Sequence, residues 1–384
     1  MNKTLRKYSL KLHLWLGLAS GIVVFIVCIT GCLYVFKDEI NEATQPWRFV
    51  APQQLPVLPP SQITAIAGSL AGGATPTAIT YGEEYDAVFV DYFDPEKGMT
   101  TVYLNPYSGE VLKTVVKHTD DFDFFRFVLD GHRRLWLPRA IGSPIVGYSV
   151  LLFFITLITG FILWWPRSWT WKALRPRLTF RRPTTFSKLN FDLHQVAGVY
   201  AALLLIMLCF TGLIFGLSWF SKAVYVVTSG GEELKPYTLP VSDTLQTTCP
   251  LVEPLDRLYH QLRQEEPEAT TFYFALPTQA DGVIRVSIVH KRGSYYRTDN
   301  LFFDRYTLAP LQGSGPYAGK YREATAADKF RRMNLEIHDG RICGLPGKML
   351  MFLASLIGAS LPVTGFVMWQ KKRKAKRTRQ QLTH

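Results

Sequence analysis

His13-Leu-Trp-Leu-Gly17 opens an apolar segment that ends in Cys28-Ile-Thr30-Gly31, and the same pattern returns in the second half of the chain. From His194 the sequence again has a glycine four residues on, and Cys209-Phe-Thr211-Gly212 follows at the same offsets. As an α-helix, the step from His13 to Thr30 would cover about 25 Å, close to the thickness of the apolar core of a bilayer. We therefore expect each segment to cross a membrane, with its histidine near one face.

A second pair of apolar segments repeats with its own histidine. His132 lies in Gly131-His132-Arg133, ahead of a segment that ends Thr159-Gly160-Phe161-Ile-Leu-Trp164. His338 lies in Ile337-His338-Asp339, ahead of a segment that ends Thr364-Gly365-Phe366-Val-Met-Trp369. Internal repeats of this kind indicate two tandem halves, each made of a span, a large insert, a histidine and a second span.

The apolar runs predict the fold class. Four uncharged runs, Leu12–Phe36, Ala140–Pro166, Leu193–Ser221 and Met349–Gln370, are each long enough to cross a bilayer as a helix. We expect a polytopic α-helical membrane protein with four transmembrane helices in two tandem repeats and two periplasmic α+β inserts. The expected parts are the N-terminus with the first helix (1–36), the first insert (37–139), the second helix (140–166), a basic linker (167–192), the third helix (193–221), the second insert (222–348), the fourth helix (349–370) and a basic tail (371–384).

The charge distribution predicts the orientation. The formal net charge is +13, but 18 Lys and Arg residues, with no Asp or Glu among them, lie in residues 1–12, 166–190 and 370–384. Because positively charged loops next to spans stay in the cytoplasm, both termini and the linker should be cytoplasmic and both inserts should lie outside. This accounts for the excess charge, so we expect no nucleic-acid partner. Lys37-Asp38-Glu39 follows the first run in place of a cleavage site, which favours an uncleaved anchor.

The two inserts read as degenerate copies of one α+β unit. In the first, a helix over Gln62–Leu70 and strands over Ala87–Tyr92, Thr100–Leu104 and Glu110–Val116 are expected, with a turn at Asn105–Gly109. In the second, we expect a helix over Pro254–Arg263 and a strand over Val283–Val289. Phe303–Leu311 aligns loosely with Leu104–Leu112 but lacks the glycine.

His132 is expected in a short element at the outer membrane surface, not deep in the bilayer. The Phe-rich stretch Asp120–Val128 should lie on the membrane surface, and Pro138 and Pro144 should separate His132 from the second span.

Three of the five cysteines lie in spans, where free thiols behave as small apolar side chains. Cys249 and Cys343 share the second insert, and whether they form a disulfide is left open.

The four histidines are the candidate site. A parallel two-fold repeat would place His13 beside His194 on the inner side and His132 beside His338 on the outer side. Ionisable residues at membrane depth are rare and usually functional, and two facing histidines in a bundle can ligate a haem iron from both sides.

Small residues near the histidines have two explanations. Gly17 and Gly198 lie one turn from their histidines and would let a flat macrocycle approach the backbone, as would Gly142 and Gly347 outside. Helix packing explains the glycines equally, and on glycine alone it is the better explanation.

Other cofactors fit the pattern less well. A zinc site needs four clustered ligands, and histidine pairs at opposite membrane faces do not supply them. The chain has no Cys-x-x-Cys-His for covalent haem and no Gly-x-Gly-x-x-Gly after a strand. Non-covalent haem bound between two histidines is therefore the cofactor that the residues favour, with the four histidines as axial ligands.

With these residues in place, the sequence resembles the PepSY-associated transmembrane family, and within it the inner-membrane ferric-siderophore reductases of the ferrioxamine type. The resemblance rests on His13-x-Trp-Leu-Gly17, Val102-Tyr-Leu-Asn-Pro-Tyr-Ser-Gly-Glu-Val-Leu112, His132, His194-x-x-x-Gly198 and His338, together with the four Thr-Gly pairs.

The resemblance implies a bacterial inner-membrane protein with two periplasmic PepSY-like domains. It also implies two b-type haems and the reduction of Fe(III) in a periplasmic siderophore, for example a hydroxamate. The electron donor, cytoplasmic or membrane-bound, is not identified by the sequence. Arg133 is expected to contact a haem propionate or an acidic chelate, although a solvated cation explains it as well. Three other functions stay open: a siderophore permease, a PepSY-based regulator or scaffold, and a haem electron-carrier subunit for another enzyme.

The charge distribution gives a first prediction. Reporter fusions at Arg175 and at the C-terminus should show a cytoplasmic location, because cationic segments beside spans are retained inside. Fusions within either insert should show a periplasmic location. A periplasmic signal from the fusion at Arg175 would contradict the four-span topology.

Overall fold

The computed structural model describes residues 3–72, 74–96, 98–180, 185–244 and 252–381. The chain forms two compact units. One contains Met1–Lys37, Asp123–Val224 and Ile337–His384, and the other contains Asp38–Phe122 and Tyr225–Glu336. Each unit is therefore assembled from both halves of the sequence, as the tandem repeat requires.

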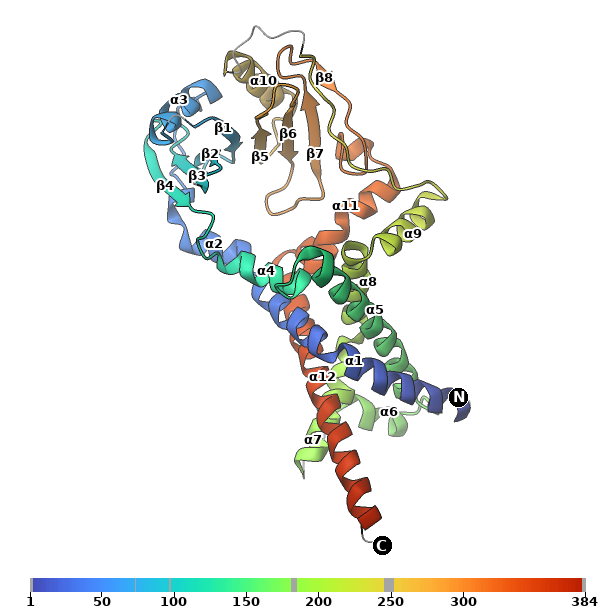
Figure 1. Cartoon of the computed structure of the whole chain (residues 1–384). Helices are drawn as coiled ribbons and strands as arrows, with labels where there is room; N and C mark the ends of the chain where they lie inside the picture. The colour runs from blue at the N-terminus through green and yellow to red at the C-terminus, as the bar shows by residue number, and fades with distance from the viewer. Residues whose placement is uncertain (1–2, 73, 97, 181–184, 245–251, 382–384) are drawn as a thin grey trace. The chain divides into compact units, whose positions relative to one another are not determined.

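The first unit contains the membrane-spanning helices, which are α1 (Lys3–Tyr34), α5 (Arg139–Trp164), α8 (Gly198–Gly216) and α12 (Gly344–Gln381) (Figure 1). Four helical segments of the described chain are long and apolar enough to cross a membrane, in agreement with the predicted polytopic helical class. Helix α1 packs against α5 and α12, and α8 also packs against both of them. Val24, Phe153, Leu205 and Leu361 belong to the apolar core between these helices.

The third span begins and ends earlier than the predicted 193–221. Helix α7 (Phe186–Asp192) continues through a π-helical turn, η2 (Leu193–Ala197), directly into α8, so the candidate span covers Phe186–Gly216. At Leu217 the backbone turns extended, and a separate helix, α9 (Ser218–Ser229), follows. The fourth helix, α12, extends beyond the predicted 349–370 at both ends.

Short helices carry the chain between the spans. His132 lies in the last turn of α4 (Phe124–Arg134), outside the spanning helices, as predicted. Leu135 and Trp136 have positive φ and end α4, and Pro138 then caps α5. Pro144 lies inside α5 and does not separate elements, contrary to our expectation. The remaining helices are α2 (Lys37–Thr44), η1 (Pro46–Arg48), α6 (Trp171–Leu178), η3 (Tyr321–Glu323), α11 (Ala326–Asp339), which ends just after His338, and η4 (Arg341–Cys343).

The second unit is built on one antiparallel sheet shared by the two inserts. Its eight strands run in the order β4-β3-β2-β1-β5-β6-β7-β8. They are β1 (Pro76–Tyr81), β2 (Val88–Asp94), β3 (Gly98–Leu104), β4 (Val111–Lys117), β5 (Thr271–Ala275), β6 (Ile284–Val289), β7 (Thr298–Phe303) and β8 (Pro310–Leu311). We predicted two separate domains. Instead β1 of the first insert pairs with β5 of the second, and this pairing removes two sheet edges that would otherwise lack hydrogen-bond partners.

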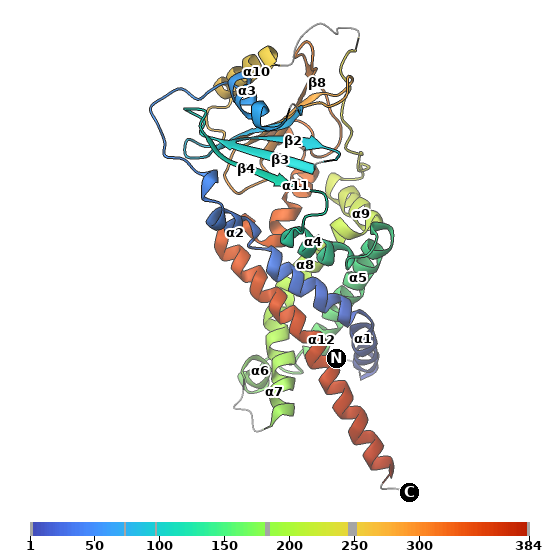
Figure 2. The same ribbon diagram turned by 60° about the vertical axis from the view of Figure 1, so that its left-hand side comes forward.

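One face of this sheet carries the core of the unit. Helices α3 (Pro60–Leu70) and α10 (Val252–Glu265) lie on it, as Figures 1 and 2 show. Alternate residues of the strands point into this core, among them Ile79, Val90, Phe272 and Phe274, which are completely buried. Burying one such side chain contributes about 1.5–3 kcal/mol, so the two central strands anchor the sheet.

The turn after β3 is kept in the second copy although its sequence differs. Asn105 accepts hydrogen bonds through Oδ1 from the backbone N–H groups of Tyr107 (2.9 Å) and Ser108 (3.4 Å). Asp304 accepts the equivalent bonds from Tyr306 and Thr307, both 2.9 Å. Gly109 has a φ of 73°, and Leu308, at the matching position, has a φ of 60°. The repeat therefore extends to backbone conformation.

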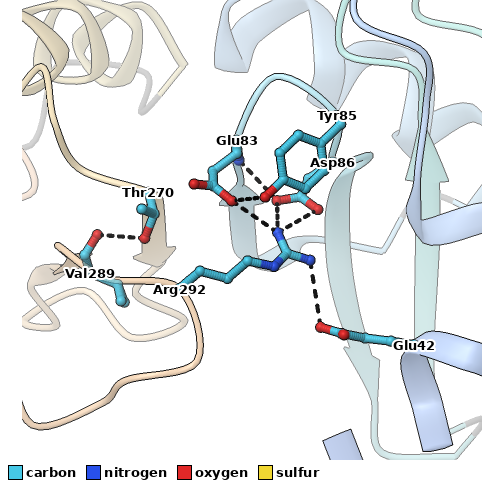
Figure 3. Close-up of polar contacts among 7 residues, drawn as sticks. All are labelled: Glu42, Glu83, Tyr85, Asp86, Thr270, Val289 and Arg292. Atoms are coloured by element: carbon cyan, nitrogen blue, oxygen red, sulfur yellow. Dashed lines mark hydrogen bonds and ion pairs between the residues drawn. The ribbon is translucent and has the colours of Figure 1, made fainter. Parts of the chain in front are cut away.

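Arg292, in the loop between β6 and β7, joins the two inserts (Figure 3). Its Nη1 lies 2.7 Å from Oδ2 of Asp86 and 3.2 Å from Oε2 of Glu83, and its Nη2 lies 3.5 Å from Glu42. Its guanidinium also lies over the ring of Tyr85, 5.0 Å from the centroid. Burial opposes the charge, but the carboxylates of Asp86 and Glu83 raise the pKa of Arg292 overall. The cluster is a structural link between the two copies.

The turn gives a second prediction. Gly109→Ala should destabilise the extramembrane unit by about 1–2 kcal/mol or more, because a side chain at positive φ is strained. In addition, the added Cβ would lie 2.6 Å from Ile66. Thermal unfolding checks this, with Gly293→Ala as the control, since Gly293 also has positive φ but has open space around it. Equal losses for both variants would show that backbone strain alone, without the Ile66 contact, sets the cost.

Candidate functional site

The four predicted histidines form two pairs within the first unit. His13, on α1, and His194, in the π-helical turn, have ring centroids 6.0 Å apart, with an interplanar angle of 88°. His132, on α4, and His338, on α11, have ring centroids 6.2 Å apart, with an interplanar angle of 65°. The pairing expected from the repeat is thus present in the fold: each pair takes one histidine from each half of the chain.

Each histidine is held by a Thr-Gly pair on a neighbouring span. The Nδ1–H of His13 donates to the carbonyl of Thr156 (3.0 Å) and lies 3.3 Å from Oγ1 of Thr159, both on α5. In return, the Nδ1 of His132 lies 2.9 Å from the carbonyl of Val27 and 3.3 Å from Oγ1 of Thr30, both on α1. The second span therefore holds the histidine of the first span, and the first span holds the histidine of the short helix α4, which precedes the second span.

The second half repeats this exchange. The Nδ1 of His194 lies 2.9 Å from Oγ1 of Thr364 on α12, and the Nδ1 of His338 lies 2.8 Å from Oγ1 of Thr211 on α8. In all four places the histidine also bonds the carbonyl of the residue three positions before the threonine; in the second half these are Leu361 and Leu208. The threonine hydroxyl donates to that same carbonyl, which leaves its oxygen able to accept from the histidine.

The glycine after each threonine makes room for the imidazole ring. A Cβ added to Gly160 would lie 3.0 Å from Cε1 of His13, and one added to Gly31 would lie 3.3 Å from Cε1 of His132. The corresponding distances are 3.5 Å from Gly212 to His338 and 3.3 Å from Gly365 to His194. We call each set of carbonyl, threonine hydroxyl and glycine a Thr-Gly cradle.

The cradles set the tautomer of the neutral rings. A carbonyl only accepts hydrogen bonds, so Nδ1 carries the proton and Nε2 keeps its lone pair. Within the described part of the chain, Nδ1 makes all the hydrogen bonds of these four rings. In the outer pair, burial lowers the pKa of both His132 and His338, which favours the neutral, ligating form. Metal-bound histidines are typically oriented by such a bond from the second ring nitrogen.

The ring separations fit a shared metal ion. Two bonds of about 2.0 Å from histidine nitrogen to metal, plus about 1 Å from each nitrogen to its ring centre, give about 6 Å between ring centroids. Direct edge-to-face packing covers the same range, but it gives no reason for four oriented rings with Nδ1 engaged. The described residues contain no group of three or more His, Cys, Asp or Glu that would form a zinc site. The donor set fits an iron whose remaining ligands come from a macrocycle.

The glycines named from the sequence have structural roles. A Cβ on Gly17 would meet Thr156 at 3.6 Å, and one on Gly198 would meet Leu361 at 3.2 Å, so both serve contacts between helices. A Cβ added to Gly142 would lie 2.0 Å from the carbonyl oxygen of Arg134, and one added to Gly347 would lie 2.0 Å from that of Gly340, so neither position has room for a side chain. These contacts agree with a helix-packing role, and a role toward a cofactor stays a prediction. The Thr-Gly pairs, which we used only as a sign of the repeat, are the ones that contact the histidine rings.

Two further predicted residues are placed differently. Arg133 is exposed on α4, next to His132. Its neighbour Arg134 pairs with Asp130 at 2.5 Å, whereas Arg133 is exposed and can reach an acidic group. Cys249 lies outside the described residues, so its predicted relation to Cys343 is not addressed by the fold.

The two histidine pairs lie at opposite ends of the bundle. Helix α1 reaches both, because it carries His13 of one pair and Thr30 of the cradle for the other pair. The rise of an α-helix places these positions about 25 Å apart. Between them the bundle interior is apolar, with Val24, Phe153 and Leu205 at its centre.

These features define a class of protein: a helical membrane protein that presents two histidine pairs near opposite ends of a four-helix bundle. The model of the PepSY-associated TM region matches residues 10–372, which is nearly the whole chain, and the protein belongs to this family. A comparison with curated proteins gave no significant match.

The Thr-Gly cradle gives a third prediction. Thr159→Val should weaken cofactor affinity at the inner pair about 10–100-fold, the range expected when the group that orients a metal-bound histidine is lost. Thr156→Val is the matched control, because the Thr156 hydroxyl bonds only a carbonyl of its own helix, that of Leu152. Cofactor titration monitored by absorbance measures both. Equal affinities for the two variants would remove the orienting role of Thr159.

Proposed function

We propose that this protein carries electrons across the bacterial inner membrane through two haem b groups and reduces Fe(III) bound to a siderophore in the periplasm. The observation that carries this proposal is the pair of histidine sites, each with two neutral imidazoles whose Nε2 atoms are left for a metal. Family membership and the four candidate spans support the membrane setting.

The chain's own residues would perform three tasks. The four histidines supply the axial ligands, and the Thr-Gly cradles fix their orientation and tautomer. The apolar core between the pairs keeps water and ions out of the bundle. Bound between two histidines, haem b supplies a one-electron carrier whose potential is lower than with a Met/His pair.

The substrate follows from the chemistry of iron. Chelators with hard oxygen donors strongly prefer Fe(III), and reduction to Fe(II) weakens the complex and allows release. The balanced step is one electron per iron: the protein loses one electron, and Fe(III) in the chelate becomes Fe(II). The donor that supplies this electron on the cytoplasmic side is a separate partner, either soluble or in the membrane.

The paired ligands give a fourth prediction. His13→Ala and His194→Ala should each remove the inner haem, and His132→Ala and His338→Ala should each remove the outer one, leaving about half the haem per chain. Haem content and the reduced absorbance spectrum measure this. His260→Ala is the matched control, because His260 is exposed on α10, outside both pairs. Loss of one common haem in both His13→Ala and His132→Ala would contradict the pairing.

The reductase function has its own test. The anaerobically reduced protein should be reoxidised when a ferric hydroxamate siderophore is added, and a colorimetric Fe(II) chelator should trap the product. The iron-free siderophore should leave the protein reduced, and His338→Ala should transfer electrons far more slowly. A reduced spectrum that persists with excess ferric siderophore would exclude reduction of this substrate class. Haem without reductase activity would then favour an electron-carrier subunit, and absence of haem would favour a regulator or permease.

A further inference from the structure

The face of the sheet opposite to α3 and α10 has an unusual composition. Residues directly opposite one another on neighbouring strands share a face, so the strand register identifies its members. One row crosses the sheet as Thr101, Asp91, Ala78, Ala275, Arg285 and Phe302, and the next as Tyr103, Phe89, Thr80, Tyr273, Ser287 and Asn300. We call these two rows the open face, because nine of the twelve side chains are partly exposed, whereas Ala78, Thr80 and Phe302 are buried. In each row the middle positions come from β1 and β5, where the two inserts meet.

Arg285 is the first unexplained group on this face. Its Nε is buried and has no hydrogen-bond partner among the described residues. Its guanidinium carbon lies 5.9 Å from the centroid of the Tyr273 ring. An arginine has five N–H donors, and leaving the buried Nε–H without an acceptor costs stability. The guanidinium is therefore placed to donate to acceptors that the described chain does not supply.

Thr80 and Asp91 are two further polar groups on this face. Thr80 is 8 % exposed, and its hydroxyl has no hydrogen-bond partner in the described chain. Asp91 is half-buried, and its carboxylate accepts one hydrogen bond, from Thr101 Oγ1 at 2.6 Å. Burial raises the pKa of Asp91 more than this bond lowers it. A cationic group near Asp91 would therefore be favourable.

The distance between Asp91 and Arg285 on the open face is three strand-to-strand intervals, which sets the size of the molecule that could contact both. Asp91 and Arg285 lie at opposite ends of the four-residue row Asp91-Ala78-Ala275-Arg285, which is about 14 Å at the usual strand spacing. Because the two residues between them are alanines, side chains in the middle of this row project little from the sheet. The aromatic rings of Phe89 and Tyr273 and the hydroxyl of Thr80 stand in the next row.

We propose that the open face binds the ferric chelate, with Arg285 donating to the oxygen atoms around the iron. This inference rests on the proposed function. The occupant to which the residues point is a hydroxamate chelate. Its iron-bound oxygens are hydrogen-bond acceptors for the guanidinium, and its methylene chains pack on Phe89 and Tyr273. Asp91 pairs with a cationic tail and repels a trianionic chelate such as a tris-catecholate.

Binding is tested with the Ga(III) complex of a trihydroxamate, which has the shape and charge of the iron complex but is not reduced. Calorimetry on the full-length protein in nanodiscs measures its Kd. Arg285→Gln should raise the Kd at least tenfold, as expected for loss of hydrogen bonds from a charged group. Ala275→Leu should abolish binding by filling the middle of the row. Arg257→Gln, at an exposed arginine on α10, is the matched control and should leave the Kd unchanged.

Two further measurements separate this role from a structural one. Because Arg285 lacks hydrogen-bond partners in the described chain, Arg285→Gln should not lower the Tm, which excludes misfolding as the cause of weaker binding. Asp91→Asn should improve the binding of a Ga(III) tris-catecholate relative to the wild type. In the reoxidation assay, Arg285→Gln should raise the half-saturating concentration of ferric chelate and leave the limiting rate unchanged.

The outcomes distinguish this proposal from the proposed function. Equal Kd values for the wild type and Arg285→Gln, or no binding of the gallium complex by the wild type, would overturn the open-face site. If the gallium complex binds through Arg285 but the iron complex does not reoxidise the protein, the binding site stands and the reductase function fails. If reoxidation is normal and its half-saturation does not change in Arg285→Gln, the function stands and the site fails.

Discussion

The hydrogen bond from histidine Nδ1 to a Thr-Gly cradle on a neighbouring span is the interaction on which the arrangement of the bundle depends. It occurs four times, and each time it joins two helices of the same half: two spans for His13 and His194, and a short helix and a span for His132 and His338. An imidazole in an apolar bundle is costly unless its polar atoms are satisfied, so each bond both holds the ring and fixes the approach of two helices. The helix packing and the ligand geometry therefore have a common cause.

The cradle can be built from small side chains, because the backbone supplies most of its hydrogen bonds. The threonine hydroxyl returns a hydrogen bond to its own helix, so the cradle needs no residue from a third helix. The glycine beside it lets Cε1 of the ring come within a few ångströms of the helix backbone. In the second half, the π-helical turn at Leu193–Ala197 shifts His194 relative to a regular helix, and Asn190 adds a hydrogen bond to the carbonyl of Thr364 (2.9 Å). The two halves thus reach the same geometry by slightly different local routes.

Outside the spans, the repeat produces a single structure from two copies. The pairing of β1 with β5 joins the inserts at their central strands, and Arg292 links loops of the two copies through the carboxylates of Glu83 and Asp86. The core face is well filled, whereas the open face keeps a guanidinium and a hydroxyl without hydrogen-bond partners in the described chain. Proteins commonly accept such a loss of stability where a ligand later satisfies the groups.

The sequence by itself determined the four spans, the tandem repeat and the choice of the four histidines, because apolar length and repeated spacing are properties of the linear chain. It also determined most strands near the Asn105 turn, where alternation and turn chemistry are local. It did not reveal the shared sheet, since β1 and β5 lie almost 200 residues apart and their pairing is a long-range contact. It likewise did not reveal that the glycine after each threonine makes room for an imidazole ring, because that ring comes from another helix. Only the tertiary structure brings His13 to Thr159 and His132 to Thr30, because these partners lie on different helices and more than 100 residues apart.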